Sequence, residues 1–241
     1  MTSIGLVLFD LDDTLFAHRE AVEDGIVRHL AAVRGPFTGA DPVAAQVLWR
    51  DLEEEHYHSY LAGALDFHGQ RRERARAFCA AYDVVLDDDE AAAWFETYFT
   101  HYRDSWRLHD DALACLDALA VAGVRVGLIT NGELTFQTEK IRQVGLAPRV
   151  EHVIASGELG VAKPDPRIFH HACSVFGVEP SNAVYVGDRL RTDAIGAAAA
   201  GLTGVWIDRR AASVAPADAA DAARLAVRRL TGLKALPATL V

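Results

Sequence analysis

Three aspartates directly follow a short apolar run near the start of the chain. The stretch LVLFDLDDTLF, residues 6–16, places Asp10, Asp12 and Asp13 after a run that ends at Phe9. If the extended backbone continues past Phe9, Asp10 and Asp12 point the same way, because successive side chains of a strand alternate between its faces. Two carboxylates in one small space repel each other unless a cation or hydrogen bonds compensate. The stretch therefore predicts a bound cation.

The same residues also have a purely structural interpretation. Asp12, Asp13 and Thr14 are all good N-cap residues, so a strand, a turn and a capped helix beginning near Leu15 would explain them equally well. A calcium-binding EF-hand loop fits poorly, because the positions that need glycine and glutamate, counted from Asp10, hold leucine and alanine.

Further polar side chains follow later apolar runs. Lys163 precedes Pro164, which biases the lysine towards an extended backbone and starts a helix. Asp193 stands where it could simply cap the Ala-rich helix that comes next. Carboxylate oxygens suit Mg²⁺, while a hydroxyl, a lysine and backbone amides near Gly132 suit a phosphate group, so together they predict phosphoryl transfer. The candidate residues are Asp10, Asp12, Thr130, Lys163, Asp188 and Asp193.

Five short apolar runs alternate with helical patterns along the chain. This alternation is typical of βαβ units, so we expect an α/β fold with a Rossmann-like core, in which a parallel sheet is flanked by helices. In open α/β sheets the ligand site lies beyond the carboxyl ends of the strands. The runs are residues 4–9, 124–129, 152–155, 183–186 and 203–207, and the polar residues that end them are Asp10, Thr130, Ser156, Asp188 and Asp208.

The sequence also predicts where three further segments begin or end. Asp110 or Asp111 is expected to cap a helix that stops at Gly123, and residues 164–176 predict a helix that stops at Gly177. The Ala-rich residues 211–221 are expected to form a surface loop before a last short strand and helix.

The interval between the first two runs lacks a comparable strand pattern and predicts helices instead. An insert of this length beside a strand end is typical of a lid. We expect a core domain at residues 1–16 and 107–241 and an inserted all-helical cap domain at residues 17–106. The expected helices are residues 20–33, 42–61, 69–82 and 88–102. Aromatic residues on one face of the last indicate helix packing. The arginines of residues 71–76 could grip an anionic substrate, but a charge run on a helix is more typical of a solvated face, which is the expectation here.

Composition narrows the function classes. The chain has 241 residues, of which 51% are hydrophobic, enough for a substantial core. Its formal net charge of −10 argues against nucleic acid or an anionic membrane as a partner, since both reward a basic surface. Three cysteines without a CxxC pair favour neither a disulfide framework nor a zinc site, and no apolar run is long enough to span a membrane. A cytoplasmic protein is expected.

The ordered motifs resemble those of the haloacid dehalogenase (HAD) superfamily of hydrolases, in the branch with a helical cap. DLDDT at residues 10–14 is similar to the first motif, TNG at 130–132 to the second, Lys163 with PDPRIF to the third, and GDRLRTD at 187–193 to the fourth. Within the superfamily, LITNGELTFQTEKI and VGDRLRTDAIGA are similar to the N-acylneuraminate-9-phosphatases and pyrimidine 5′-nucleotidases.

The resemblance implies a Mg²⁺-dependent phosphatase in which each motif residue has a role. Asp10 would be the nucleophile that becomes an aspartyl phosphate, and Asp12 would be the general acid and then the general base. Mg²⁺ would be held by Asp10, the backbone carbonyl of Asp12, and Asp188.

The remaining motif residues would bind the phosphoryl group. Thr130, the amide of Asn131 and Lys163 would hold its oxygens. Asp193 would orient Lys163 or a metal-bound water without contacting the substrate itself. The resemblance further implies a small-molecule phosphate ester as substrate, such as a sugar phosphate or a nucleoside monophosphate.

Other functions of the same residue set are less well matched. A 2-haloacid dehalogenase has no use for Asp12 or the metal, because its leaving group is a halide. Sugar phosphomutases share the motifs but usually carry glycine where this chain has Asp13. A phosphoacceptor receiver module has no aspartate two residues after the one that is phosphorylated. A non-catalytic binding module is a further alternative.

Overall fold

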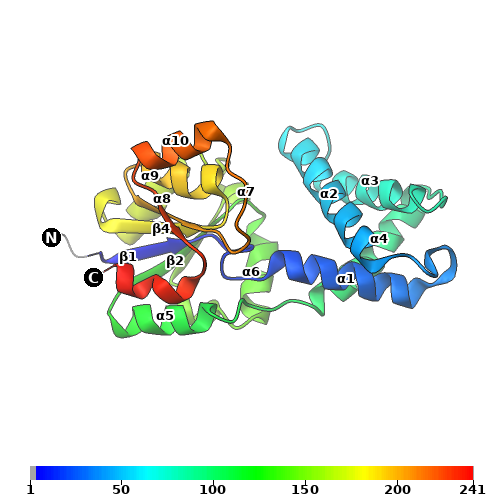
Figure 1. Ribbon diagram of the computed structural model, residues 1–241, viewed down its shortest axis with the longest axis horizontal. Coiled ribbons are helices and arrows are strands. Elements are labelled where there is room, and N and C mark those ends of the chain that lie inside the picture. Colours follow the sequence, from blue (N-terminus) through cyan, green and yellow to red (C-terminus); the bar gives the residue numbers. More distant parts are fainter. Residues whose placement is uncertain (1–3, 241) are drawn as a thin grey trace. The chain divides into compact units, whose positions relative to one another are not determined.

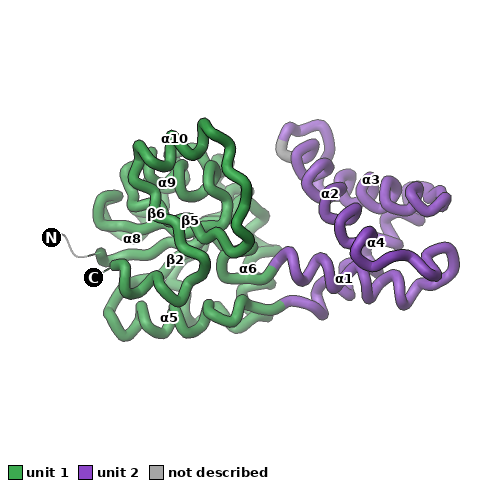
Figure 2. Tube along the Cα trace, in the orientation of Figure 1, with its two compact units in different colours: residues 1–17, 107–241 green, residues 18–106 purple. Residues whose placement is uncertain are grey.

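The chain forms two compact units (Figure 2). In the computed structural model, which describes residues 4–240, one unit contains the residues up to Ala17 together with those from Arg107 onwards, and the other contains His18–Trp106. Among the described residues, no helix is both long and apolar enough to cross a membrane.

The described residues of the first unit contain one parallel sheet of six strands in the order β3-β2-β1-β4-β5-β6. This confirms the expected α/β fold class. Phe9 pairs with Leu128 on one side and Val186 on the other, so the carboxyl ends of β1, β2 and β4 lie at the same edge. The strands are β1 (Leu6–Phe9), β2 (Arg125–Thr130), β3 (His152–Ala155), β4 (Ala183–Gly187), β5 (Thr203–Ile207) and β6 (Arg228–Leu230).

Helices cover both faces of the sheet, with α8, α9 and α10 on one side and α5 on the other (Figure 1). Buried residues of α8 and α9 pack on Leu8 of β1 and Tyr185 of β4, which anchors the central strands. α8 begins at a cap in which Asp165 accepts a hydrogen bond from the Arg167 amide. The helices are α5 (Ala112–Val121), α6 (Leu134–Gln143), α7 (Ser156–Leu159), α8 (Pro166–Phe176), α9 (Gly196–Ala199) and α10 (Pro216–Arg224), with a π-helical turn at Leu190–Ile195.

Three expectations for this unit are wrong in detail. The predicted loop at residues 211–221 contains the start of α10, and the chain after β6 ends in the 3₁₀ turns Leu233–Ala235 and Pro237–Thr239 instead of a longer helix. Asp111 precedes α5 but makes no capping hydrogen bond. Its carboxylate instead accepts hydrogen bonds from Arg209 and from the Leu233 amide, because a guanidinium fork is a stronger partner than a helix terminus.

The second unit is all helical within the described residues. α4 begins at a capping box, in which the Asp87 side chain accepts from the Glu90 amide and the Glu90 side chain accepts from the Asp87 amide. Its aromatic face packs inside the unit, with Tyr98 edge-on to Trp49 at a centroid distance of 4.5 Å. The helices are α1 (His18–Val33), α2 (Pro42–Leu61), α3 (Phe67–Ala80) and α4 (Asp88–Arg103), with a 3₁₀ turn at Gly35–Phe37.

The arginines of α3 do not form the solvated face that their run predicts. Arg74 is only 3% exposed, lies 3.8 Å from the ring centroid of Trp49, and pairs with Glu53 at 2.9 Å. Arg71 stacks over the rings of Phe67 and Phe99. A helix that carries a cation towards an aromatic cluster gains cation–π attraction as well as burial of its apolar stem, and the charge pattern alone does not reveal this.

A buried histidine makes this unit sensitive to acid. His29 of α1 is fully buried and lies edge-on to Trp94 at 4.3 Å, and neither ring nitrogen has a hydrogen-bond partner among the described residues. Burial, together with nearby His101, lowers the pKa of His29 from 6.5 to about 4. At this histidine the unfolded chain binds a proton below about pH 6.5, whereas the folded chain binds one only below about pH 4. The free energy of unfolding therefore falls as the pH falls through this window.

We expect His29→Leu to remove this acid sensitivity. Between about pH 7.5 and pH 5, the wild-type free energy of unfolding should fall by about 2 kcal/mol more than that of the variant. Urea unfolding followed by tryptophan fluorescence at the two pH values measures the difference. His171→Leu, at an exposed position of α8, is the matched control and should behave as wild type. Equal pH dependence in the wild type and His29→Leu would contradict the assignment.

Candidate active site

The sequence-predicted residues meet at the carboxyl edge of the central strands. Asp10 follows β1, Thr130 ends β2, and Asp188 follows β4, while Asp193 lies in the π-helical turn after β4. Asp10, Thr130 and Asp193 are each less than one-tenth exposed. Residues separated by more than 180 positions along the chain are thus brought together by parallel pairing.

The Lys163 side chain is the centre of this cluster. Its Nζ donates hydrogen bonds to Asp10 Oδ1 at 2.6 Å, Asp193 Oδ1 at 2.7 Å and the Tyr185 hydroxyl at 2.7 Å. Burial alone would lower the pKa of Lys163, but the carboxylates of Asp10 and Asp193 outweigh it and raise the pKa. The lysine is therefore a fixed buried cation.

The loop that carries Lys163 is tied to the end of β2 by Asn131. The Asn131 Nδ2 donates to the Lys163 carbonyl at 2.9 Å, and the Lys163 amide donates to Asn131 Oδ1 at 2.8 Å. The side chain of Asn131 is thus used to position Lys163, a role that its assignment through the backbone amide did not include.

Three carboxylates share the space next to the lysine. Asp10, Asp188 and Asp193 each offer an oxygen within 4.8 Å of the others. Burial, opposed by Lys163 and reinforced by Asp193 and Asp12, raises the pKa of Asp10 from 3.8 to about 7. Burial, followed by the charges of Asp10 and Asp193, raises the pKa of Asp188 well above its usual range. One lysine does not balance this charge, and a set of hard carboxylate oxygens fits Mg²⁺.

Asp193 does not cap a helix, as its position in the sequence suggested. One of its oxygens accepts from Lys163 and the other from the Arg189 amide at 2.9 Å, four residues earlier. Gly187 makes this possible, because a Cβ at that position would collide with the Asp193 side chain. The glycine of the fourth motif thus clears the space that Asp193 needs to face Lys163.

Asp12 has different partners from the other carboxylates. Its Oδ1 accepts from Lys140 Nζ at 2.6 Å and its Oδ2 from Gln137 Nε2 at 3.0 Å. Sequence reasoning missed Lys140 and Gln137, as well as Tyr185. The available signal was the i, i+3 spacing of two polar residues next to the apolar Ile141, which places all three on the buried face of α6.

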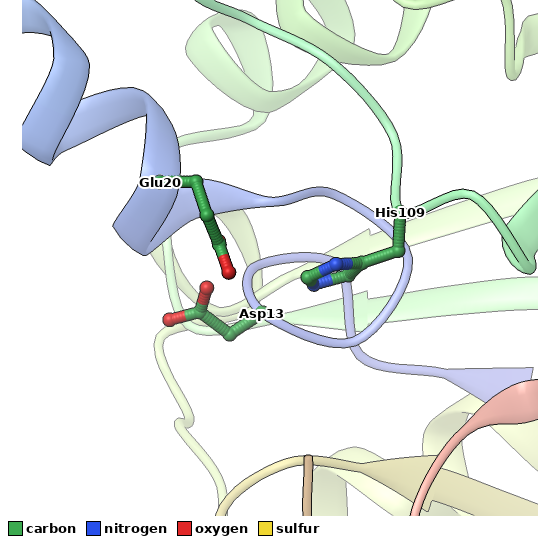
Figure 3. A group of neighbouring side chains, drawn as sticks. All are labelled: Asp13, Glu20 and His109. Carbon is green, nitrogen blue, oxygen red and sulfur yellow. The ribbon is translucent and has the colours of Figure 1, made fainter. Parts of the chain in front are cut away.

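The turn after β1 excludes the alternative that Asp12, Asp13 and Thr14 cap a helix near Leu15, because α1 begins only at His18. Asp13 adopts a left-handed backbone with φ 61°, and its amide donates to the Phe16 carbonyl at 2.7 Å. Figure 3 shows Asp13 on this tight turn and the ring of His109, from the segment before α5, directed towards it. A backbone hydrogen bond closes the turn, and the Asp12 side chain binds to α6.

Two curated relatives match this chain over most of both lengths. Phosphoserine phosphatase of Thermus thermophilus is 33% identical over 226 residues, which cover 85% of this chain and 88% of the relative. Human N-acylneuraminate-9-phosphatase is 30% identical over 215 residues, which cover 87% and 84%.

Two solved structures share the architecture. The HAD hydrolase YfnB of Bacillus subtilis, described as bound to magnesium, has a TM-score of 0.79 and 18% identity over 99% of both chains, a level of identity that shows the fold alone. A 2-haloacid dehalogenase of Pseudomonas syringae pv. Tomato DC3000 has a TM-score of 0.65 and 27% identity over 98% of both chains.

The family model agrees with the geometry. The model of the haloacid dehalogenase-like hydrolases matches residues 4–201, a range that includes every motif residue at the carboxyl edge of the sheet. The order of the four motifs, the placement of three of them at the ends of β1, β2 and β4, and the identity to the two phosphatases all agree. The chain belongs to the haloacid dehalogenase-like hydrolase family.

Proposed function

We propose that the protein is a Mg²⁺-dependent phosphatase that hydrolyses a small phosphate monoester through an aspartyl phosphate on Asp10. The observation that carries the proposal is the separation of the aspartates. Asp10 lies with Lys163 in the group of buried carboxylates, whereas the Asp12 carboxylate is held by α6. The two aspartates are thus suited to different tasks, nucleophilic attack and proton transfer. The curated relatives named as phosphatases support the same reaction class.

The carboxylates next to Lys163 would hold the metal. Asp10, Asp188 and the Asp12 backbone carbonyl are the proposed ligands, and Asp193 faces the same space. When bound, Mg²⁺ would reduce the repulsion between an anionic nucleophile and an anionic ester. Burial, followed by the repulsion of neighbouring carboxylates, raises the pKa values of Asp10 and Asp188, and a cation here would stabilise their charged forms.

In the first half of the proposed reaction, an Asp10 oxygen bonds to phosphorus as the bond from phosphorus to the leaving oxygen breaks. Asp12 donates its proton to the leaving alkoxide, so an alcohol departs. Thr130, the Asn131 amide and Lys163 would hold the phosphoryl oxygens. The three hydrogens of Lys163 are already donated to protein acceptors, so a phosphoryl oxygen would replace one of them.

In the second half, water attacks the aspartyl phosphate. Asp12, now a carboxylate, accepts the proton of that water as the new bond to phosphorus forms. The bond between phosphorus and the Asp10 oxygen breaks, so inorganic phosphate leaves and the Asp10 carboxylate is restored. Asp12 has regained its proton from this water and can act as the acid on the next ester.

The helical unit, residues 18–106, is proposed to act as the cap that selects the ester. A sugar phosphate or a nucleoside monophosphate is the proposed substrate class. We also assign the protein to a reducing cytoplasm, because Cys79, Cys115 and Cys173 are free and buried.

Asp10→Asn should abolish phosphate release while leaving the fold intact. An amide cannot act as the nucleophile, so turnover of p-nitrophenyl phosphate with Mg²⁺ should fall at least about 10³-fold. A panel of sugar and nucleoside monophosphates, with and without excess chelator, extends the assay. Asp117→Asn, at an exposed surface ion pair of α5, is the matched control and should retain activity.

Other products would favour the alternatives. Halide release from a 2-haloacid would indicate a dehalogenase, and isomerisation of a sugar phosphate without phosphate release would indicate a mutase. One stable phosphoryl group per chain without turnover would indicate a phosphoacceptor module. Substantial turnover in Asp10→Asn would refute the assigned nucleophile.

Asp188→Asn should have opposite effects on stability and function. The raised pKa of Asp188 means that folding without metal places this carboxyl in an environment that disfavours its charge, a penalty that grows as the pH rises above 3.8. Near pH 7.5 without Mg²⁺, the variant should melt more than about 3 °C above wild type. Wild type should gain thermal stability as Mg²⁺ is added, whereas the variant should not, and its turnover should be lost.

Calorimetry with a Mg²⁺ titration measures both effects, with Asp117→Asn again as the control. A variant that melts below wild type and still responds to Mg²⁺ would show that Asp188 is a structural carboxylate outside the metal site.

A further inference from the structure

The partners of the Asp12 side chain lie one turn apart on α6. Lys140 Nζ is 2.6 Å from Asp12 Oδ1, and Gln137 Nε2 is 3.0 Å from Asp12 Oδ2. Both oxygens of the carboxylate are therefore anchored, which fixes the plane of the group as well as its position. A carboxylate has about four acceptor sites, so these two bonds still leave room for a proton.

The Lys140 side chain is enclosed by Asp12 and two aromatic rings. Its side chain is 1% exposed, and its Nζ lies 4.7 Å from the ring centroid of Phe16 and 5.0 Å from that of Phe136. Burying an ion pair generally adds little stability over an apolar pair of the same size, whereas it does specify one geometry. Orientation of Asp12 is thus a better explanation for this lysine than stabilisation of α6.

Gln137 connects Asp12 to the phosphate-binding residues. Its Nε2 has two hydrogens and donates one to Asp12 Oδ2 and the other to Thr130 Oγ1 at 2.9 Å. Because Thr130 accepts this bond, its own hydroxyl hydrogen is left to donate to a phosphoryl oxygen. Gly132 provides the space, since a Cβ there would lie 2.8 Å from Gln137 Nε2.

We propose that Lys140 and Gln137 are positioning residues that aim the Asp12 carboxyl group at the leaving oxygen of the ester and hold it apart from the carboxylates of the metal site. The proposal rests on the proposed phosphatase function. The step concerned is the transfer of the Asp12 proton to the leaving oxygen as its bond to phosphorus breaks. Neither residue is assigned a contact with the ester, so each acts only through Asp12 and, for Gln137, also through Thr130.

The acidity of the leaving group provides the test. A p-nitrophenolate leaves with little help, whereas an alkoxide needs its proton, and general acid catalysis contributes about 10²–10⁴-fold. Lys140→Met should therefore lower kcat/KM about 10²-fold or more for glycerol phosphate but less than about tenfold for p-nitrophenyl phosphate. Substituted phenyl phosphates should fall between these limits, in the order of leaving-group acidity. The parameter kcat/KM reports the half-reaction in which the alcohol departs.

Two further variants keep the test decisive. Gln137→Leu removes the second anchor without leaving a buried charge unpaired and should show the same trend, so it serves if Lys140→Met folds poorly. Arg142→Met removes a positive charge from an exposed position of α6 and should match wild type. In an Asp12→Asn background, Lys140→Met should cause little additional loss, because its effect passes through Asp12.

The outcomes separate this proposal from the proposed function. An equal loss of kcat/KM for all leaving groups, no loss at all, or a full additional loss in the Asp12→Asn background would overturn the positioning role while leaving the phosphatase intact. A wild-type protein that releases no phosphate from any ester of the series would overturn the proposed function and this inference with it.

Discussion

The ion pairs of Lys163 are the interaction on which the geometry of the site depends. This one ammonium group joins Asp10 after β1, Tyr185 within β4 and Asp193 in the turn after β4, and its backbone is held by Asn131 after β2. β1, β2 and β4 are therefore linked through one residue, Lys163, by its side chain and its backbone. Removing one partner of such a network typically costs about 3–5 kcal/mol, because the remaining charges stay buried and unpaired.

The network still leaves the site with an excess of negative charge. Asp10, Asp12, Asp188 and Asp193 are four carboxylates at one edge of the sheet, and two buried lysines, Lys140 and Lys163, face them. The packed strands and helices beneath the site hold these groups in place although their charges repel. Local repulsion of this kind persists where the surrounding fold over-determines the geometry, and it is common at functional sites. In the proposed function, the excess negative charge that opposes folding would attract a divalent cation.

Sequence patterns predicted the parts of the fold and site that depend on local rules. The apolar runs located β1 to β5 because buried parallel strands are short and apolar. The motifs placed Asp10, Thr130 and Asp188 at strand ends and Lys163 just before a helix. The errors arose where tertiary partners override local preference. Asp111 and Asp193 have the residue type of helix caps, but a guanidinium and an ammonium from distant segments hold their carboxylates. For Lys140, the helical spacing with Gln137 and Ile141 indicates a buried face, but nothing local identifies Asp12 as its partner.

The division of the carboxylates into two groups explains how one small site could support two kinds of chemistry. In the proposed mechanism the nucleophile needs a neighbouring cation and no proton, whereas the acid and base must gain and lose a proton in every cycle. If the Asp12 carboxylate were itself a metal ligand, its oxygens would be engaged by that ion and could not alternate between the protonated and ionised forms. Lys140 and Gln137 anchor Asp12 to α6, and in the proposed mechanism this would separate proton transfer from the metal site. A halide leaving group needs no proton, so this separate arrangement around Asp12 is the feature that most specifically favours a phosphate ester over a haloacid.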